Sequence, residues 1–132
     1  MMTFTSVEEV REYFKNDKFA TNAGMQVEEF SDDEVICSVE LTDDHKNANG
    51  GIMGGAIFTL ADLAFAVLVN NIHKPSVAAQ VSINYLSGAK GKKLYARSRC
   101  IKTGRSTTVA SVDIYDELGT NVALFTGTAF KL

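Results

Sequence analysis

A single aspartate, Asp62, lies within a segment that is otherwise almost entirely apolar. Between Ala56 and Val69 the only other polar residue is Thr59, so this segment is expected to form a helix buried by the rest of the domain. A carboxylate buried without a partner is strongly unfavourable, so Asp62 must be paired, reach a wet cleft, or have a raised pKa. Two interpretations stay open at this point: a structural carboxylate bonded to amides or a cation, and a general base or nucleophile in a cleft.

Four glycines, Gly50, Gly51, Gly54 and Gly55, directly precede this segment. A helix usually begins with a Ser, Thr, Asp or Asn whose side chain caps the first free N–H groups. No such side chain stands at residues 52–55, so the first amides are free to bind a carbonyl oxygen that becomes an oxyanion. The alternative is that the glycines only allow the helix and the sheet to pack closely.

The spacing of Gly54 and Asp62 limits how they could act together. Eight residues of helix rise roughly 12 Å, too far for both groups to reach one carbonyl. Two helices packed antiparallel across a two-fold axis would bring Gly54 of one subunit to Asp62 of the other. Chemistry at this motif therefore requires a dimer with two symmetric sites.

A sheet must bury this helix, and the rest of the chain supplies its strands. Ser6 and Glu9 fit a capping box that starts a short helix ending near Asn16, which is expected to cover an edge or an open end of the domain. Alternating apolar residues and turn signals predict six strands, at 25–31, 34–41, 77–85, 93–102, 107–115 and 121–131. The last four are joined by hairpin-length connections, so we expect an antiparallel sheet of class α+β, curled around the central helix.

The bulk composition narrows the class of protein further. The chain has 132 residues, enough for one domain, and its net charge of −3 gives no support for nucleic-acid binding. No signal-peptide pattern is visible, and an apolar segment of about 14 residues is shorter than the roughly 20 that cross a bilayer. We therefore expect a cytoplasmic protein without a membrane partner. Cys37 and Cys100 are expected to be reduced.

Residues around the glycines form a recognisable pattern with other parts of the chain. The pattern consists of Asn47, Gly50, Gly54, Gly55, Phe58 and Leu60-Ala61-Asp62, with INYLSGA at 83–89, the turn Gly104-Arg105-Ser106 and the closing FTGTAFKL. Through these residues the chain, over roughly residues 20–132, resembles hotdog-fold acyl-CoA thioesterases of the phenylacetic-acid-degradation (PaaI-like) family. The resemblance implies one hotdog domain over 1–132, with 1–19 as N-terminal helix and lead-in, 20–132 as core, and five to six antiparallel strands around one long helix.

The resemblance also implies an activity and roles for particular residues. It implies hydrolysis of a small aromatic or medium-chain acyl-CoA in a site shared by two subunits, without metal or organic cofactor, because CoA is part of the substrate. Asp62 would be the general base or nucleophile, the Gly54 amide would polarise the thioester carbonyl, and Asn47 would position the water or the carboxylate. Family members are usually tetramers made of two such dimers.

Further residues are expected around the substrate. The expected substrate contacts are Met53, Gly55, Phe58, Ala78 and Gln80. The expected contacts of the CoA phosphates are Lys90, Lys93, Arg105 and Ser106. We expect His45 at the surface or behind the site, and His73 as a cation near the C-terminal dipole of the helix.

Two residues depart from the family pattern. Met53 replaces the motif histidine and cannot donate a hydrogen bond or carry a proton. Ala78 stands where many relatives have Ser or Thr, although Ser76 is two residues away. Losing such groups could lower the rate by orders of magnitude, or Met53 could reshape the pocket for another apolar acyl group. Two rivals follow: a hotdog dimer that binds acyl-CoA with little or no turnover, and an enoyl-thioester hydratase, which the missing histidine disfavours.

Overall fold

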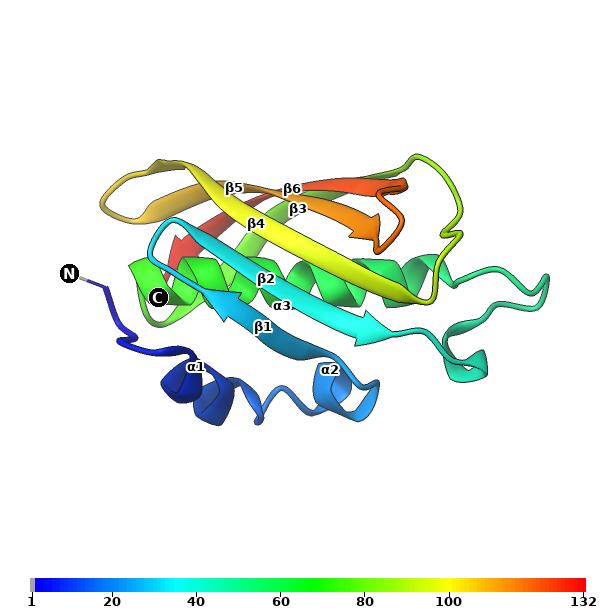
Figure 1. Ribbon diagram of the computed structural model, residues 1–132. Coiled ribbons are helices and arrows are strands. Elements are labelled where there is room, and N and C mark those ends of the chain that lie inside the picture. The colour runs from blue at the N-terminus through cyan, green and yellow to red at the C-terminus, as the bar shows by residue number, and fades with distance from the viewer. Residues whose placement is uncertain (1) are drawn as a thin grey trace.

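Six antiparallel strands wrap around one long helix (Figure 1). The computed structural model describes residues 2–132, with helices α1 (Val7–Phe14), α2 (Lys18–Asn22) and α3 (Gly54–Ile72), a 3-10 helix η1 (Asp43–His45), and strands β1 (Gln26–Phe30), β2 (Glu34–Glu40), β3 (Ser76–Tyr85), β4 (Lys93–Thr103), β5 (Thr107–Asp116) and β6 (Asn121–Lys131). The sheet order is β1-β2-β4-β5-β6-β3. The predicted α+β class, the antiparallel sheet and the central helix are confirmed, whereas α2 was not predicted.

The core lies between α3 and the concave face of the sheet. Leu60, Phe65 and Leu68 of the helix are buried there against side chains of the central strands. At Gly127 of β6 a Cβ atom would lie 2.8 Å from the ring of Phe65 and 3.1 Å from Val81. Only glycine at this position lets the helix come so close to the sheet.

The sequence predicted that α3 is buried on all sides, but the sheet leaves one side of the helix open. One stripe of the helix stays half-buried or exposed, and its members recur every three or four residues, so they share one face. We call this the open stripe; it consists of Gly55, Phe58, Thr59, Asp62 and Ala66. Asp62 therefore lies at the boundary between core and solvent rather than deep in the core.

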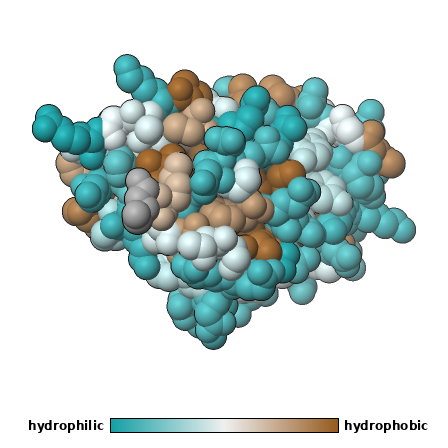
Figure 2. All heavy atoms as spheres, turned by 60° about the vertical axis from the view of Figure 1, so that its left-hand side comes forward, coloured by the Kyte–Doolittle hydropathy of each residue, from teal (hydrophilic) through white to brown (hydrophobic). Residues whose placement is uncertain are grey.

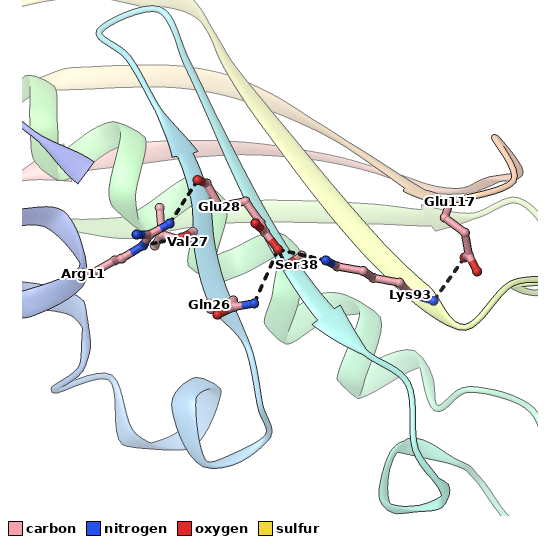
Figure 3. A network of polar contacts seen from close by, with 7 residues as sticks. All are labelled: Arg11, Gln26, Val27, Glu28, Ser38, Lys93 and Glu117. Carbon is pink, nitrogen blue, oxygen red and sulfur yellow. Dashed lines mark hydrogen bonds and ion pairs between the residues drawn. The ribbon is translucent and has the colours of Figure 1, made fainter. Parts of the chain in front are cut away.

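The two edges of the sheet differ in how they are protected. The β1 edge is covered by α1, from which Arg11 donates hydrogen bonds to the carbonyls of Val27 (2.8 Å) and Glu28 (3.2 Å) (Figure 3). This confirms that the N-terminal helix covers an edge. The β3 edge has no neighbour among residues 2–132 and is mostly exposed. Its ten residues contain no charge, although edge strands of isolated sheets are usually guarded by charged residues or proline.

Helix α3 is longer than the apolar segment of about 14 residues from which it was predicted. The helix has 19 residues, so its length and composition alone would allow it to cross a bilayer. Its position argues for a core helix, because 56% of its most apolar 18-residue window is buried inside this fold.

Candidate active site

The start of α3 exposes free backbone amides, as the sequence predicts. Met53 occupies the N-cap position with extended backbone (φ −62°, ψ 135°) and makes no side-chain cap. Its carbonyl accepts hydrogen bonds from the N–H groups of Ala56 (3.0 Å) and Ile57 (3.2 Å). Within residues 2–132, the N–H groups of Gly54 and Gly55 donate to no acceptor. Two adjacent donors at the positive end of a helix dipole are suited to bind a carbonyl oxygen.

The four glycines before and at the start of α3 differ in what the structure demands of them. Gly50 has φ +86°, in the left-handed region that favours glycine. Gly54 faces the ring of Tyr85, and a Cβ there would lie 3.1 Å from the Tyr85 Cζ. Close packing therefore explains Gly54 in part, as the alternative interpretation proposed. At Gly51 and Gly55 a Cβ would meet nothing nearer than 3.9 Å, so neither turn geometry nor packing within the chain demands glycine there. Gly55 leaves room for a ligand or a second subunit.

Asn47 orders the turn that leads into α3. Its Oδ1 accepts hydrogen bonds from the N–H groups of Asn49 (2.9 Å) and Gly51 (3.1 Å), and its own N–H donates to the Gly51 carbonyl (2.7 Å). These bonds use the side-chain oxygen, so only the Nδ2 amino group is left to position a water or a carboxylate. The side chain acts first on the shape of the turn.

Asp62 has no protein partner among the described residues. No hydrogen bond or ion pair from residues 2–132 reaches its carboxylate, which argues against a paired structural role within this part of the chain. It lines a cavity of about 290 Å³ formed by Asp17, Lys18, Phe19, Ala20, Phe58, Thr59, Asp62 and Leu63. Burial, and next the negative charge of Asp17, raise the pKa of Asp62 above its usual value. A half-buried carboxylate with a raised pKa, facing a cavity, is suited to accept a proton or to act as a nucleophile.

The opposite wall of this cavity is formed by residues that no sequence pattern indicated. Asp17 precedes α2 at its N-cap position but makes no side-chain cap, and burial raises its pKa as well. Phe19, at the start of α2, is 81% exposed beside the cavity. Five residues are too few to show a helical periodicity, so only the polar Asp17 before Lys18 could have indicated a helix start here.

The predicted substrate contacts come from two elements, the first turns of α3 and strand β3. Met53 (54% exposed) and Gly55 stand at the helix start, while Phe58 packs on Phe125 with ring centroids 5.5 Å apart. On β3, Ala78 pairs with buried Ala129, which places Ala78 on the inner face.

Gln80 departs from this arrangement. It pairs with Thr128, and a register shift between Ala78 and Gln80 puts its side chain on the outer face. Alternation along residues 77–85 would place Val77 on the same face as Val81 and Ile83, but Val77 pairs with exposed Phe130 and lies on the outer face. A bulge cannot be read from alternation, because one extra residue reverses the faces of everything before it.

The four residues expected at the CoA phosphates lie at opposite ends of the sheet. Lys90 and Lys93 stand before and at the start of β4, whereas Arg105 and Ser106 form the β4–β5 turn (Figure 1). An eleven-residue strand spans roughly 35 Å, so one protomer cannot direct both pairs at a single phosphate group. The end with the β4–β5 turn is largely hydrophilic, with small separate hydrophobic patches (Figure 2).

Lys93 is already paired within the chain. Its Nζ lies 3.0 Å from Glu28 Oε1, and Glu28 also accepts a hydrogen bond from the Ser38 hydroxyl (2.5 Å) (Figure 3). The Ser38 and Lys93 contacts lower the pKa of Glu28, so the carboxylate stays charged opposite the lysine. Lys93 is therefore less available to a phosphate than its sequence position suggested, and Lys90 is the freer of the two.

A buried carboxylate fixes the loop that carries Lys90. Asp116 accepts hydrogen bonds from the N–H groups of Lys90 and Gly91 (both 2.9 Å), Leu118 (3.0 Å) and Thr120 (2.8 Å). Burial alone would raise the pKa of Asp116, but the N–H donors of Thr120, Lys90 and Gly91 outweigh it and hold this pKa far below the usual range. The loop between β3 and β4 therefore depends on this carboxylate together with that of Glu117, which accepts the N–H groups of Lys92 (2.9 Å) and Lys93 (3.1 Å).

We expect Asp116→Asn to lower the free energy of unfolding by about 2–3 kcal/mol at pH 7, because an amide NH2 would face backbone N–H donors. A carboxyl whose folded pKa is lowered stabilises the fold above its unfolded pKa, near 3.9, and loses that contribution as the pH falls below it. In urea titrations, the difference in free energy of unfolding between wild type and variant should therefore become smaller between about pH 4 and pH 2. An equal gap at pH 7 and pH 2.5 would contradict this assignment.

Both histidines have structural contacts. His45 is 8% exposed, with Nδ1 accepting the Thr42 N–H (3.0 Å) and Nε2 donating to the Ala23 carbonyl (2.7 Å). Of its two expected positions, at the surface or behind the site, the surface position is therefore wrong. His73 Nε2 contacts the Gly104 carbonyl (2.7 Å), which ties the β4–β5 turn to the end of α3. Neither lines the Asp62 cavity, but the His45 carbonyl accepts a hydrogen bond from the N–H of Met53 (2.8 Å), directly before α3. Among residues 2–132 no group of three His, Cys, Asp or Glu side chains could hold a metal.

The fold and the site together define a class of protein. An antiparallel sheet wraps a helix whose glycine-rich start offers free amides and whose middle carries an unpaired carboxylate. This is the hotdog architecture with the groups that a thioester hydrolase needs: donors for the carbonyl oxygen and a base or nucleophile.

Comparisons with known proteins agree with this class. Residues 49–123 match the family described as thioesterase superfamily. The acyl-coenzyme A thioesterase PaaI of Escherichia coli is 28% identical over 120 residues, which cover 90% of this chain and 86% of that protein. Its structure has a TM-score of 0.88 at 25% identity, covering 95% and 91% of the two chains. A hypothetical thioesterase from Streptococcus pneumoniae, solved with coenzyme A, has a TM-score of 0.81 at 32% identity, covering 89% and 94%.

The chain therefore belongs to the thioesterase superfamily, as a PaaI-like hotdog thioesterase. It is a thioester hydrolase by family and by the groups at its site.

Proposed function

We propose that this protein hydrolyses a small aromatic or medium-chain acyl-CoA to the free acid and CoA. The observation that carries the proposal is the unpaired Asp62 carboxylate in a cavity of about 290 Å³, on the same helix as the free Gly54 and Gly55 amides. Phe19, Phe58 and Leu63 make part of the cavity wall apolar, as an acyl group requires. The E. coli relative is named an acyl-CoA thioesterase, and the S. pneumoniae relative was solved with CoA.

The site is proposed to form between two subunits. The β3 edge is uncharged and unpaired within residues 2–132, and it meets the helix beside the start of the open stripe, where Tyr85 contacts Gly54. A second copy is proposed to extend the sheet at β3 and to cover the stripe. A two-fold axis there would set the two α3 helices antiparallel and bring the glycine end of one toward Asp62 of the other. We also propose, as the resemblance implies, that two such dimers form a cytoplasmic tetramer without membrane or nucleic-acid partners.

The proposed reaction uses both ends of α3. The Gly54 and Gly55 amides of one subunit bind the thioester oxygen, and Asp62 of the other removes a proton from water. The resulting hydroxide adds to the carbonyl carbon, the C–S bond breaks, and the CoA thiolate leaves and takes up a proton. If Asp62 is the nucleophile instead, it forms a mixed anhydride that water then hydrolyses, with the same overall products.

The alternative is an acyl-CoA-binding hotdog protein with little or no turnover. The observation in its favour is Met53, which is 54% exposed at the helix start and offers no donor where the motif has histidine. Ser76 does not replace the missing strand hydroxyl, since its Oγ donates to the His73 carbonyl in the turn after α3.

A panel of acyl-CoA thioesters tests the proposal. Purified protein should release CoA, measured with a thiol reagent, fastest from thioesters such as benzoyl-, phenylacetyl-, hexanoyl- or octanoyl-CoA. Calorimetry on the same panel separates binding from turnover. Tight binding with no CoA release, and no gain of activity in Met53→His, would favour the binding protein. If the protein neither binds nor hydrolyses any thioester of the panel, both proposed functions are wrong.

A further inference from the structure

The hydroxyl of Tyr85 contacts the backbone of the helix start directly. Tyr85 is the last residue of β3, and its hydroxyl donates a hydrogen bond of 2.9 Å to the Gly54 carbonyl. The ring also lies against the Gly54 Cα, where a Cβ would come within 3.1 Å of both Cζ and Oη. The contact joins residues 31 positions apart, so it holds the first turn of α3 against the sheet edge.

This hydrogen bond acts on a particular peptide unit. The Gly54 carbonyl belongs to the same peptide group as the Gly55 N–H, which has no acceptor within the described chain. A donor on the carbonyl polarises the peptide and makes its N–H a stronger donor. A carbonyl oxygen has two lone pairs, so it can accept the tyrosine bond together with the helical bond. The same contact limits rotation of this peptide, which glycines on both sides would otherwise leave loose.

We propose that Tyr85 is a positioning residue for the oxyanion site: its hydroxyl orients and polarises the Gly54–Gly55 peptide so that the Gly55 N–H binds the thioester oxygen beside the Gly54 N–H. The proposal rests on the hydrolysis proposed above. It also gives the exposed position of Tyr85 (52%) a reason, because a ring at the helix start borders the space in which the thioester would lie. Tyr85 thereby supplies a polar contact at the helix start, where Met53 supplies none.

Tyr85→Phe tests this role, because it removes the hydroxyl and keeps the ring against Gly54. Tyr13→Phe is the matched control. The Tyr13 ring packs edge to face on Phe14 and under the Lys74 ammonium, far from the start of α3, and its hydroxyl makes no hydrogen bond within residues 2–132. We expect Tyr85→Phe to lower kcat about tenfold for the best acyl-CoA of the panel, with KM changed less than twofold, and Tyr13→Phe to change neither. A folding defect would lower the active fraction or change KM, so thermal melting of both variants is measured in parallel.

A second measurement does not depend on activity. With only 10 glycines in the chain, 15N-glycine labelling gives a simple amide spectrum, and the Gly55 proton should move upfield in Tyr85→Phe but not in Tyr13→Phe. An unmoved Gly55 amide, or an unchanged kcat, would overturn the positioning role. If the amide moves but wild type hydrolyses no thioester of the panel, the hydrolysis proposal fails and the catalytic role of Tyr85 fails with it, while the contact itself stands.

Discussion

Asp62→Asn should lower kcat by about 1,000-fold for the best acyl-CoA substrate, with CoA release measured as the thiol appears. Asparagine has nearly the same shape as aspartate, but it cannot accept the proton of water or attack as a nucleophile. KM should change little, because Asp62 lines the acyl cavity without binding CoA in this proposal. Asp33→Asn, at an exposed residue of the β1–β2 turn, is the control and should retain full activity.

The same variant should not be less stable than wild type at pH 7. Burial and the charge of Asp17 raise the pKa of Asp62, so the folded state binds this proton more tightly than the unfolded state. The ionised carboxylate therefore destabilises the fold once the pH rises above the unfolded pKa near 3.9, up to and beyond the folded value. Asp62→Asn removes that penalty, and its stability relative to wild type should be highest at neutral pH and decline as the pH falls. Wild-type activity should fall as the pH drops through the raised pKa.

Two results would count against the role of Asp62. Equal rates in wild type and Asp62→Asn would mean that another group acts as base, even if hydrolysis is observed. A large loss of stability in Asp62→Asn would mean that the carboxylate has a structural partner, such as one in a second subunit.

Gly54→Pro should lower kcat by about 100-fold relative to Gly54→Ala. Proline removes the Gly54 N–H, and the first helical position tolerates proline well. The backbone of Met53, at φ −62° and ψ 135°, already has the extended conformation required before proline. Gly54→Ala is the matched control because it adds the same Cβ against Tyr85, at 3.1 Å, but keeps the N–H. Equal losses in both variants would assign the effect to the clash with Tyr85 rather than to the amide.

Mixed dimers of Asp62→Asn and Gly54→Pro chains test whether one active site contains residues of both subunits. If Asp62 and Gly54 of one site come from different subunits, a dimer of one Asp62→Asn and one Gly54→Pro chain has one doubly defective site and one intact site. Random exchange makes about half of all dimers mixed, so activity should recover to about a quarter of wild type. Differently tagged chains, purified through both tags, show that exchange has occurred. Purified mixed dimers without activity would place both groups of a site in the same subunit.

Several features of this protein follow from sequence patterns because their causes are local. The uncapped start of α3 follows from the absence of a capping side chain at residues 52–55. The helix that carries Asp62 follows from its nearly continuous apolar segment, and the six strands follow from the alternation of apolar and polar residues, which indicates the buried face of each. The spacing of Gly54 and Asp62 along one helix is also local, and it predicts a site divided between two subunits, which the mixing experiment tests.

The tertiary structure alone decided the features that depend on residues distant in sequence. Tyr85 meets Gly54 across 31 positions, and Asp17 meets the Asp62 cavity across 45, so no local pattern could pair them. The bulge in β3 sends Gln80 to the outer face because one extra residue reverses the alternation. The sequence predicted that α3 lies in a closed core and carries one carboxylate among apolar residues. Its open stripe was decided by where the sheet ends, since six strands wrap only part of a helix and leave Asp62 at the border.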